Sequence, residues 1–152
     1  MYRNILLPID GSQPSLRAAG HGIELARALD ARVTVIMVTT PWATQFAREV
    51  AVVVPGVLVP QNEYDLRTET AACNCLRVVT EEAGSAGVAS KALHARHRDP
   101  YVAILEAARE HGCDLIVMAS HGRRGLTELL LGSETVKVLT HSEIPVLVYR
   151  RP

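Results

Sequence analysis

The chain has 152 residues, enough for one domain with a hydrophobic core and too few for two domains of ordinary size. Hydrophobic residues make up 48% and charged residues 21% of the sequence, which is a globular rather than a disordered composition. The formal net charge is +0, so the sequence lacks the basic excess by which general nucleic-acid-binding proteins displace counterions from phosphates.

Cysteine content and hydropathy exclude two further classes of protein. Cys73, Cys75 and Cys113 form no disulfide framework, and the first two lack the CxxC spacing of a redox or zinc site. The start of the chain has no signal-peptide layout, and the apolar stretch 50–60 falls well short of the ~20 residues that span a bilayer. We therefore expect a cytoplasmic protein that does not enter the membrane.

The first predicted strand is the apolar run 5–9, which ends at an Asp-Gly-Ser turn and suits a strand buried on both faces. A helix capped by Ser12 or Ser15 is predicted next. Its expected buried face has small and apolar residues at spacings of three and four: Leu16, Ala19, Ile23, Ala26 and Leu29. The β-branched run 33–38 predicts the second strand.

The middle of the chain is harder to interpret. The stretch 39–62 has no clear period, and we expect an irregular insertion with a short helix. A helix is predicted over 63–83, and these residues are expected to form its buried stripe: Leu66, Ala71, Cys75, Val78 and Val79. The alternation over 88–95 predicts a strand that is less buried than the others.

The second half of the chain predicts two more helices and two more strands. Asp at the N-cap and Pro at the first helical position indicate a helix over 99–112. A buried strand over 115–118, a helix over 133–140 and a strand over 145–149 follow. Because strands alternate with helices throughout, the sequence predicts a mostly parallel sheet with helices on both faces.

Two strand ends carry residues that suit a nucleotide, at the edge where open α/β sheets bind their ligands. The carboxylate of Asp10 can accept hydrogen bonds from ribose hydroxyls or an adenine amino group. Gly122 allows the backbone to turn closely around an anion, and Arg123 adds positive charge. Gly132 and Ser133 stand at the start of the last helix, where free N–H groups favour phosphate. The spacing matches neither the P-loop nor the dinucleotide-binding pattern.

Each of these features also has a structural interpretation. Asp-Gly-Ser is ordinary turn chemistry, and the arginines at 123–124 suit a solvated surface. His121 fits a loop residue that bonds locally better than it fits a general base. The set of glycines after a buried strand nevertheless favours a phosphate site, whereas no residue set is typical of a nucleophile–base pair, a carboxylate dyad or a catalytic metal.

With Asp10 at the end of the first strand, SHGRRGLTELLLGS over 120–133 and IPVLVY over 144–149, the chain resembles the universal stress protein family. The resemblance covers essentially the whole chain and is weakest over 39–62. It implies a single Rossmann-like α/β domain over 1–152, with an open five-stranded sheet in the strand order 3-2-1-4-5.

The resemblance also implies a nucleotide site. ATP-binding members of the family carry G-x2-G-x9-G-[ST], of which Gly122, Gly132 and Ser133 match the second glycine, the third glycine and the hydroxyl residue. Ala119 replaces the first glycine, and its methyl group either crowds the ligand or is accommodated by a negative φ. From adenine to phosphate tail, the implied site residues are Pro8, Ile9, Asp10, Val38, Met118, Ala119, Gly122, Arg123, Gly132, Ser133, Glu134 and Thr135.

The implied function is that of a stress-response regulator, a dimeric switch that binds ATP or another adenine nucleotide, with Mg²⁺ beside the phosphates. The homodimer is expected to form through the apolar strand Pro145–Tyr149, and an unidentified protein partner is expected as well. Two alternatives stay open: an interaction protein that needs no nucleotide, and a slow ATP-hydrolysing enzyme.

Overall fold

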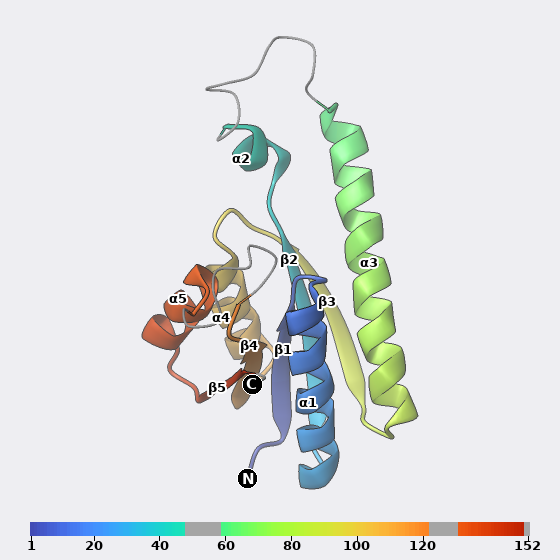
Figure 1. Cartoon of the computed structure of the whole chain (residues 1–152), viewed down its shortest axis with the longest axis vertical. Helices are drawn as coiled ribbons and strands as arrows, with labels where there is room; N and C mark the ends of the chain where they lie inside the picture. Colours follow the sequence, from blue (N-terminus) through green and yellow to red (C-terminus); the bar gives the residue numbers. More distant parts are fainter. Residues whose placement is uncertain (48–58, 122–130, 151–152) are drawn as a thin grey trace.

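The computed structural model describes residues 1–47, 59–121 and 131–150, and its centre is a five-stranded parallel sheet (Figure 1). The strands are β1 (Asn4–Ile9), β2 (Arg32–Thr39), β3 (Ser90–Arg96), β4 (Leu115–Ala119) and β5 (Val146–Tyr149). Their order is β3-β2-β1-β4-β5, and every neighbouring pair is parallel. The predicted strand order 3-2-1-4-5 is confirmed.

Helices cover both faces of this sheet. They are α1 (Gln13–Leu29), α2 (Trp42–Ala47), α3 (Gln61–Ser85), α4 (Pro100–Glu110) and α5 (Ser133–His141). Helices α1 and α3 pack on one face, and α4 and α5 pack on the other (Figure 1). The short helix predicted in the irregular insertion is α2, whereas residues 48–58 lie outside the described residues.

The central strand β1 serves two hydrophobic cores at once, because successive side chains of a strand point to opposite faces. All six of its residues are buried. Ile5 and Leu7 belong to the core under α1 and α3, and Leu6 belongs to the core under α4 and α5. The uninterrupted apolar run therefore reflects burial on both faces, as predicted.

Helix α1 begins after Ser12. Of the two candidate caps, the structure selects this residue, whose side chain accepts a hydrogen bond from the backbone N–H of Ser15 at 3.3 Å.

Helix α1 approaches β1 closely because its inner face is built largely from small residues. A Cβ atom placed on Gly22 would lie 2.4 Å from Cδ2 of the fully buried Leu7, so glycine is what permits this contact.

The predicted buried stripe of the long helix is largely wrong. Leu66 and Val78 are 68% and 48% exposed, and of the five expected residues only Val79 is fully buried, while Cys75 packs partly against the core. The buried stripe instead follows one helical face: Ala72, Leu76, Val79 and Ala83. Leu66 lies off this face, because the neighbouring residue Asp65 is the one that faces the end of β3 and meets Arg96.

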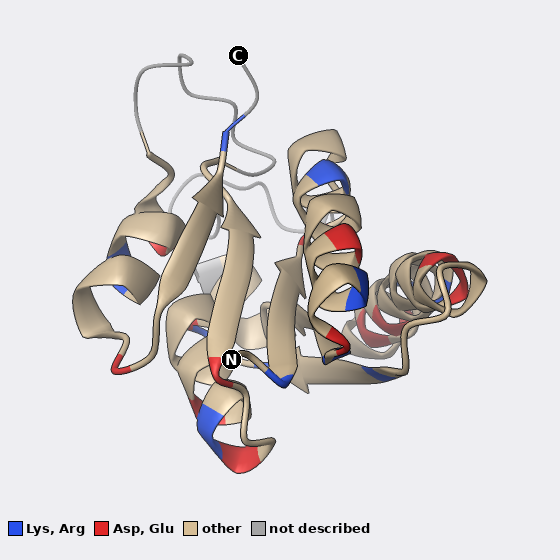
Figure 2. Cartoon of the chain, turned by 90° about the horizontal axis from the view of Figure 1, so that it is seen from below, with Lys and Arg blue, Asp and Glu red and all other residues tan. Residues whose placement is uncertain are grey.

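Charged residues lie on the helices and at the ends of the strands, as Figure 2 shows. One such residue, Asp114, precedes β4 and accepts hydrogen bonds from the backbone N–H groups of Arg3 and Asn4 at 2.8 and 3.1 Å, which fixes the start of β1 beside β4.

In the part of the chain that the structure describes, no helix is long and apolar enough to cross a membrane.

Candidate functional site

The turn after β1 holds Asp10 in a defined position at the carboxyl edge of the sheet. Oδ1 of Asp10 accepts a hydrogen bond from the backbone N–H of Ser12 at 2.9 Å, and Gly11 supplies the positive φ of 80° that the turn requires. The hydroxyl of Ser15 accepts from the backbone N–H of Asp10 and donates to the carbonyl of Ser12. The half-buried carboxylate is thus anchored where β1 meets α1.

The start of α5 lies directly against the end of β4. The backbone N–H of Gly132 donates to the carbonyl of Ser120 at 2.6 Å. A Cβ atom on Gly132 would lie 3.3 Å from Cα of His121 and 3.4 Å from the Ser120 carbonyl oxygen, which is tighter than ordinary van der Waals contact. Glycine at position 132 therefore favours the close approach of the two backbone segments, although its φ of −61° is open to any residue.

Ala119, the residue that replaces the first motif glycine, is the last residue of β4 and pairs with Tyr149 of β5. Among the described residues, the only non-glycine residue with a positive φ is Asp30. The backbone at Ala119 therefore has a negative φ, which alanine adopts without strain.

Thr135 and Glu134 fix the first turn of α5 to its neighbours through their side chains. The buried hydroxyl of Thr135 donates to the carbonyl of Ala119 at 2.9 Å. Oε2 of Glu134 accepts from the backbone N–H of Tyr101 at 3.0 Å, and its Oε1 accepts from Nζ of Lys137 at 2.9 Å. The hydrogen bond that Lys137 donates to Glu134 raises the pKa of Lys137. A ligand at this turn would therefore meet backbone N–H groups rather than these two side chains.

The cap of α4 is a feature that the sequence analysis missed. Asp99 is the N-cap residue, as predicted, but its side chain makes no capping hydrogen bond. Glu134 of α5 instead binds the N–H of Tyr101 in the first turn of α4. By contrast, the N-cap residue of α5 is Gly132, which has no side chain to cap the helix. The first N–H groups of α5, at the carboxyl edge of the sheet, therefore have no side-chain cap.

Ten of the twelve predicted site residues lie in the described part of the chain, at the carboxyl ends of β1, β2 and β4 or in the first turn of α5. They are Pro8, Ile9, Asp10, Val38, Met118, Ala119, Gly132, Ser133, Glu134 and Thr135. These elements meet because β1 pairs with both β2 and β4. Gly122 and Arg123 lie outside the described residues.

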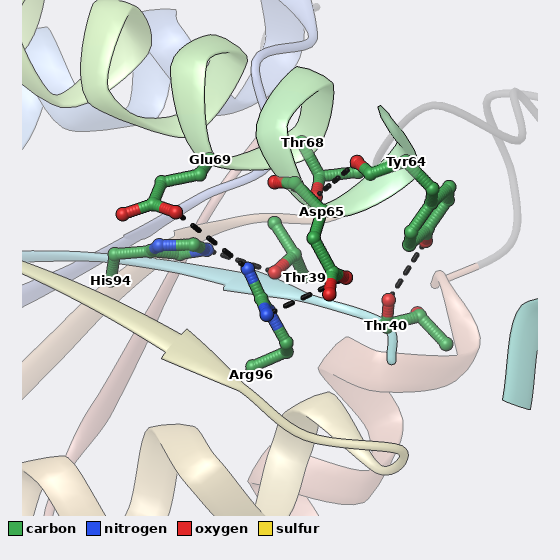
Figure 3. Close-up of polar contacts among 8 residues, drawn as sticks. All are labelled: Thr39, Thr40, Tyr64, Asp65, Thr68, Glu69, His94 and Arg96. Carbon is green, nitrogen blue, oxygen red and sulfur yellow. Dashed lines mark hydrogen bonds and ion pairs between the residues drawn. The ribbon is translucent and has the colours of Figure 1, made fainter. Parts of the chain in front are cut away.

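A second polar cluster joins β2 and β3 to α3 at the same edge (Figure 3). Nε2 of His94 lies 2.8 Å from the hydroxyl of Thr39. The guanidinium of Arg96, on the same face of β3, lies 3.5 Å from a carboxylate oxygen of Asp65 and 3.9 Å from one of Glu69. These contacts hold the amino-terminal half of α3 against the ends of the two strands.

Stability is expected to depend on pH through His94. Partial burial lowers the pKa of His94 below its ordinary 6.5, Arg96 lowers it further and Glu69 partly offsets both. Because the folded state favours the neutral ring, this contribution is present above pH 6.5 and is lost as the pH falls through the lowered pKa. We expect denaturant unfolding between about pH 7 and pH 5 to show a shallower loss of stability in His94→Gln than in the wild type. An identical pH profile in the variant would contradict this expectation.

One other place in the described structure offers less to a nucleotide. A shallow pocket of about 360 Å³, with Asn4, Arg32 and Lys91 among its lining residues, opens at the amino ends of β1 to β3. That is the edge opposite to the one at which open α/β sheets bind ligands. Within residues 1–47, 59–121 and 131–150, no group of three or more His, Cys, Asp or Glu side chains is arranged to hold a metal ion.

Comparison with known proteins gives a consistent result along the whole chain. The model of the universal stress protein family matches residues 1–150. Universal stress protein MJ0531 of Methanocaldococcus jannaschii is 33% identical over 100% of this chain and 84% of its own length. Universal stress protein YxiE of Bacillus subtilis is 32% identical over 99% of this chain and 100% of its own length.

Solved structures agree with the fold. The structure of MJ0577 from Methanocaldococcus jannaschii superposes with a TM-score of 0.81 at 28% identity, covering 100% of this chain and 98% of that one. Three more distant structures, with TM-scores of 0.66, 0.67 and 0.61, contain cAMP, AMP and dAMP respectively. They share 24%, 18% and 17% identity with this chain and show the fold alone.

Proposed function

The chain belongs to the universal stress protein family, and we propose that it binds an adenine nucleotide, ATP foremost, at the carboxyl edge of its sheet. The bound nucleotide would bias a homodimer or a partner surface, which makes the protein a regulatory switch rather than an enzyme. The whole chain over 1–152 would act as one domain in this role.

The strongest support is the start of α5. A helix amino terminus presents N–H groups and a partial positive charge, both of which favour phosphate. Here that terminus has no side-chain cap and lies against the end of β4 through the close contact at Gly132. Asp10 is anchored in the turn after the adjacent strand β1, where its carboxylate would contact the ribose or the base.

The proposed roles follow the order of the strands. Pro8, Ile9, Asp10 and Val38 would contact adenine and ribose, and Met118 and Ala119 would contact the ribose and the first phosphate. Gly132 and Ser133 would hold the phosphate tail, with Glu134 and Thr135 contributing backbone N–H groups because their side chains are already bonded. Gly122 and Arg123 complete the proposed set. Mg²⁺ would bind mainly to the phosphates, since such ions keep several waters and few protein ligands.

The ligands seen in distant relatives agree with an adenine nucleotide. Structures of this fold have been determined with cAMP, AMP and dAMP, three ligands that share the adenine base. Those proteins are too distant to assign a ligand to this chain. The proposal of ATP therefore rests on the glycine motif and on the position of α5.

Replacement of Asp10 tests the proposal. Titration calorimetry of nucleotide-free protein with ATP and Mg²⁺ is expected to give a Kd in the micromolar range for the wild type and a value at least about tenfold weaker for Asp10→Ala, since a hydrogen bond to a charged group is lost. Asp10→Asn is the matched variant, because its amide oxygen can still accept from the N–H of Ser12 and preserve the turn. Failure of the folded wild type to bind ATP would refute the nucleotide proposal.

We also propose that β5 pairs with β5 of a second copy of the chain. It is the edge strand of the sheet, all four of its residues are only partly buried, and its partner strand β4 occupies one side only. An uncovered apolar edge favours strand pairing, which lysine disfavours. Sedimentation equilibrium is expected to show a dimer for the wild type and a folded monomer for Val148→Lys. A monomeric wild type would contradict the pairing.

A further inference from the structure

The pocket at the amino ends of β1 to β3 lies on the face of the sheet that α4 covers. Ile36 of β2 belongs to the core under α4. Thr34 and Arg32 precede Ile36 by two and four residues, so their side chains project to the same face. Lys91 of β3 pairs with Thr34 in parallel register and therefore shares that face. Strand geometry thus brings Arg32, Thr34 and Lys91 to one pocket, which all three line.

The floor of this pocket is polar, buried and internally bonded. Asn4 and Thr34 are each only 2% exposed, and the hydroxyl of Thr34 donates to Oδ1 of Asn4 at 3.1 Å. Nδ2 of Asn4 donates to the carbonyl of His111, the residue that ends α4, at 2.9 Å. That carbonyl belongs to the negative end of the α4 dipole. Its hydrogen bond to Asn4 lessens the repulsion that a bound anion would meet from this helix end.

Two exposed cationic side chains line the pocket, Arg32 and Lys91, from neighbouring strands ~4.8 Å apart. In the part of the chain that the structure describes, neither of them forms an ion pair with a carboxylate. Nζ of Lys91 lies 3.3 Å from Nδ1 of His111, and because an ammonium group only donates, the ring nitrogen is the acceptor. This contact positions Lys91 and leaves its remaining ammonium hydrogens for a ligand.

One acidic residue, Glu110, is among the described residues that line the pocket. Its exposed carboxylate offsets part of the charge of Arg32 and Lys91, and a net positive charge remains. A like charge at this place is expected to weaken the binding of an anion without preventing it. The residue therefore offers a test of opposite sign to that of the two cations.

We propose that this pocket binds a phosphate group, either as inorganic phosphate or as a small phosphomonoester. A guanidinium and an ammonium from two different strands suit the several oxygens of a tetrahedral dianion, whereas one guanidinium suffices for a planar carboxylate. The site lies at the edge of the sheet opposite to the proposed nucleotide site. It does not rest on the proposed nucleotide function.

A phosphate titration followed by NMR of the backbone amides locates the site. At constant ionic strength, saturable shifts are expected at Thr34, Lys91 and His111, with a Kd of about 1 mM or tighter. The amides of Ser133 and Glu134 report separately on any phosphate at the start of α5. Glycerol 3-phosphate distinguishes the two sources, because tighter binding than that of inorganic phosphate identifies a phosphomonoester and weaker binding identifies the free ion. Tighter binding of succinate than of either would overturn the assignment to phosphate.

Substitutions that change the charge of the pocket test which residues bind. Arg32→Gln and Lys91→Gln are each expected to weaken phosphate binding about fivefold or more, because each removes a charged donor. Glu110→Gln removes a like charge and is expected to tighten binding about two- to threefold. Arg109→Gln is the matched control, since this exposed residue of α4 is outside the lining. It is expected to leave the Kd within about twofold at physiological salt, which screens distant charges.

Three results would overturn the site. The first is the absence of saturable shifts at Lys91 and His111 in the folded wild type. The second is an equal loss of affinity in Lys91→Gln and Arg109→Gln, which would indicate general attraction of anions to the surface. The third is weaker binding in Glu110→Gln, which would contradict a bound anion. Thermal unfolding checks that each variant is folded, as expected for exposed side chains without ion pairs in the described residues.

Discussion

Replacement of Gly132 by valine is expected to abolish measurable ATP binding and to destabilise the fold. The first added carbon would lie 3.3 Å from Cα of His121 and 3.4 Å from the carbonyl oxygen of Ser120, and both of these neighbours are backbone atoms that cannot rotate away. The two further methyl groups of valine need still more room. We expect a loss of about 1–3 kcal/mol in the free energy of unfolding, as for an overpacked contact.

The loss of binding in Gly132→Val has a separate cause. Moving α5 away from β4 would displace the N–H groups that we propose for the phosphates and would break the 2.6 Å hydrogen bond from Gly132 to Ser120. Thermal unfolding and calorimetry with ATP are the measurements, and Gly84→Val on the exposed side of α3 is the matched control, since a Cβ atom there meets nothing within 4 Å. Normal ATP affinity in Gly132→Val would show that the close contact is not needed for binding.

The second large effect is expected at Gly22, in the core and away from the nucleotide. In Gly22→Ala the new methyl group would lie 2.4 Å from Cδ2 of Leu7, a side chain with no exposed surface into which it could move. We expect a loss of about 1–3 kcal/mol, which lowers Tm by roughly 2–4 °C for each kcal/mol in a protein of this size.

A double-mutant cycle identifies the contact behind the Gly22 effect. Leu7→Val removes the δ carbons, so the double variant Gly22→Ala with Leu7→Val is expected to lose less stability than the sum of the two single variants. Gly84→Ala is the control, and it is expected to gain up to about 1 kcal/mol because alanine favours an exposed helix over glycine. Additive losses in the cycle would place the strain elsewhere than at Leu7.

The features that the sequence determined by itself depend on neighbouring residues. The apolar run of β1, the Asp-Gly-Ser turn and the cap at Ser12 each involve contacts within a few positions along the chain. Local residue type decides such contacts, and the alternation of strands and helices then leaves few topologies for a parallel sheet. The general rule for open α/β sheets predicted the edge at which a nucleotide would bind, and the resemblance to the family added the strand order.

The predicted stripe of α3 failed for a reason of tertiary structure. Helical periodicity allows more than one apolar face in a sequence such as this, and only the position of the sheet selects Ala72, Leu76, Val79 and Ala83. Leu66 lies outside this stripe, so it remains exposed despite its hydrophobicity.

The details of the candidate site were likewise decided by contacts between residues distant in sequence. Glu134 caps a helix whose first turn contains Tyr101, and His94 bonds Thr39 on a different strand. No periodicity or motif links such pairs, because their proximity follows from the packing of whole elements. The sequence thus determined which residues have the chemistry for a nucleotide, whereas the tertiary structure decided which of their side chains are already bonded and which elements meet at the carboxyl edge of the sheet.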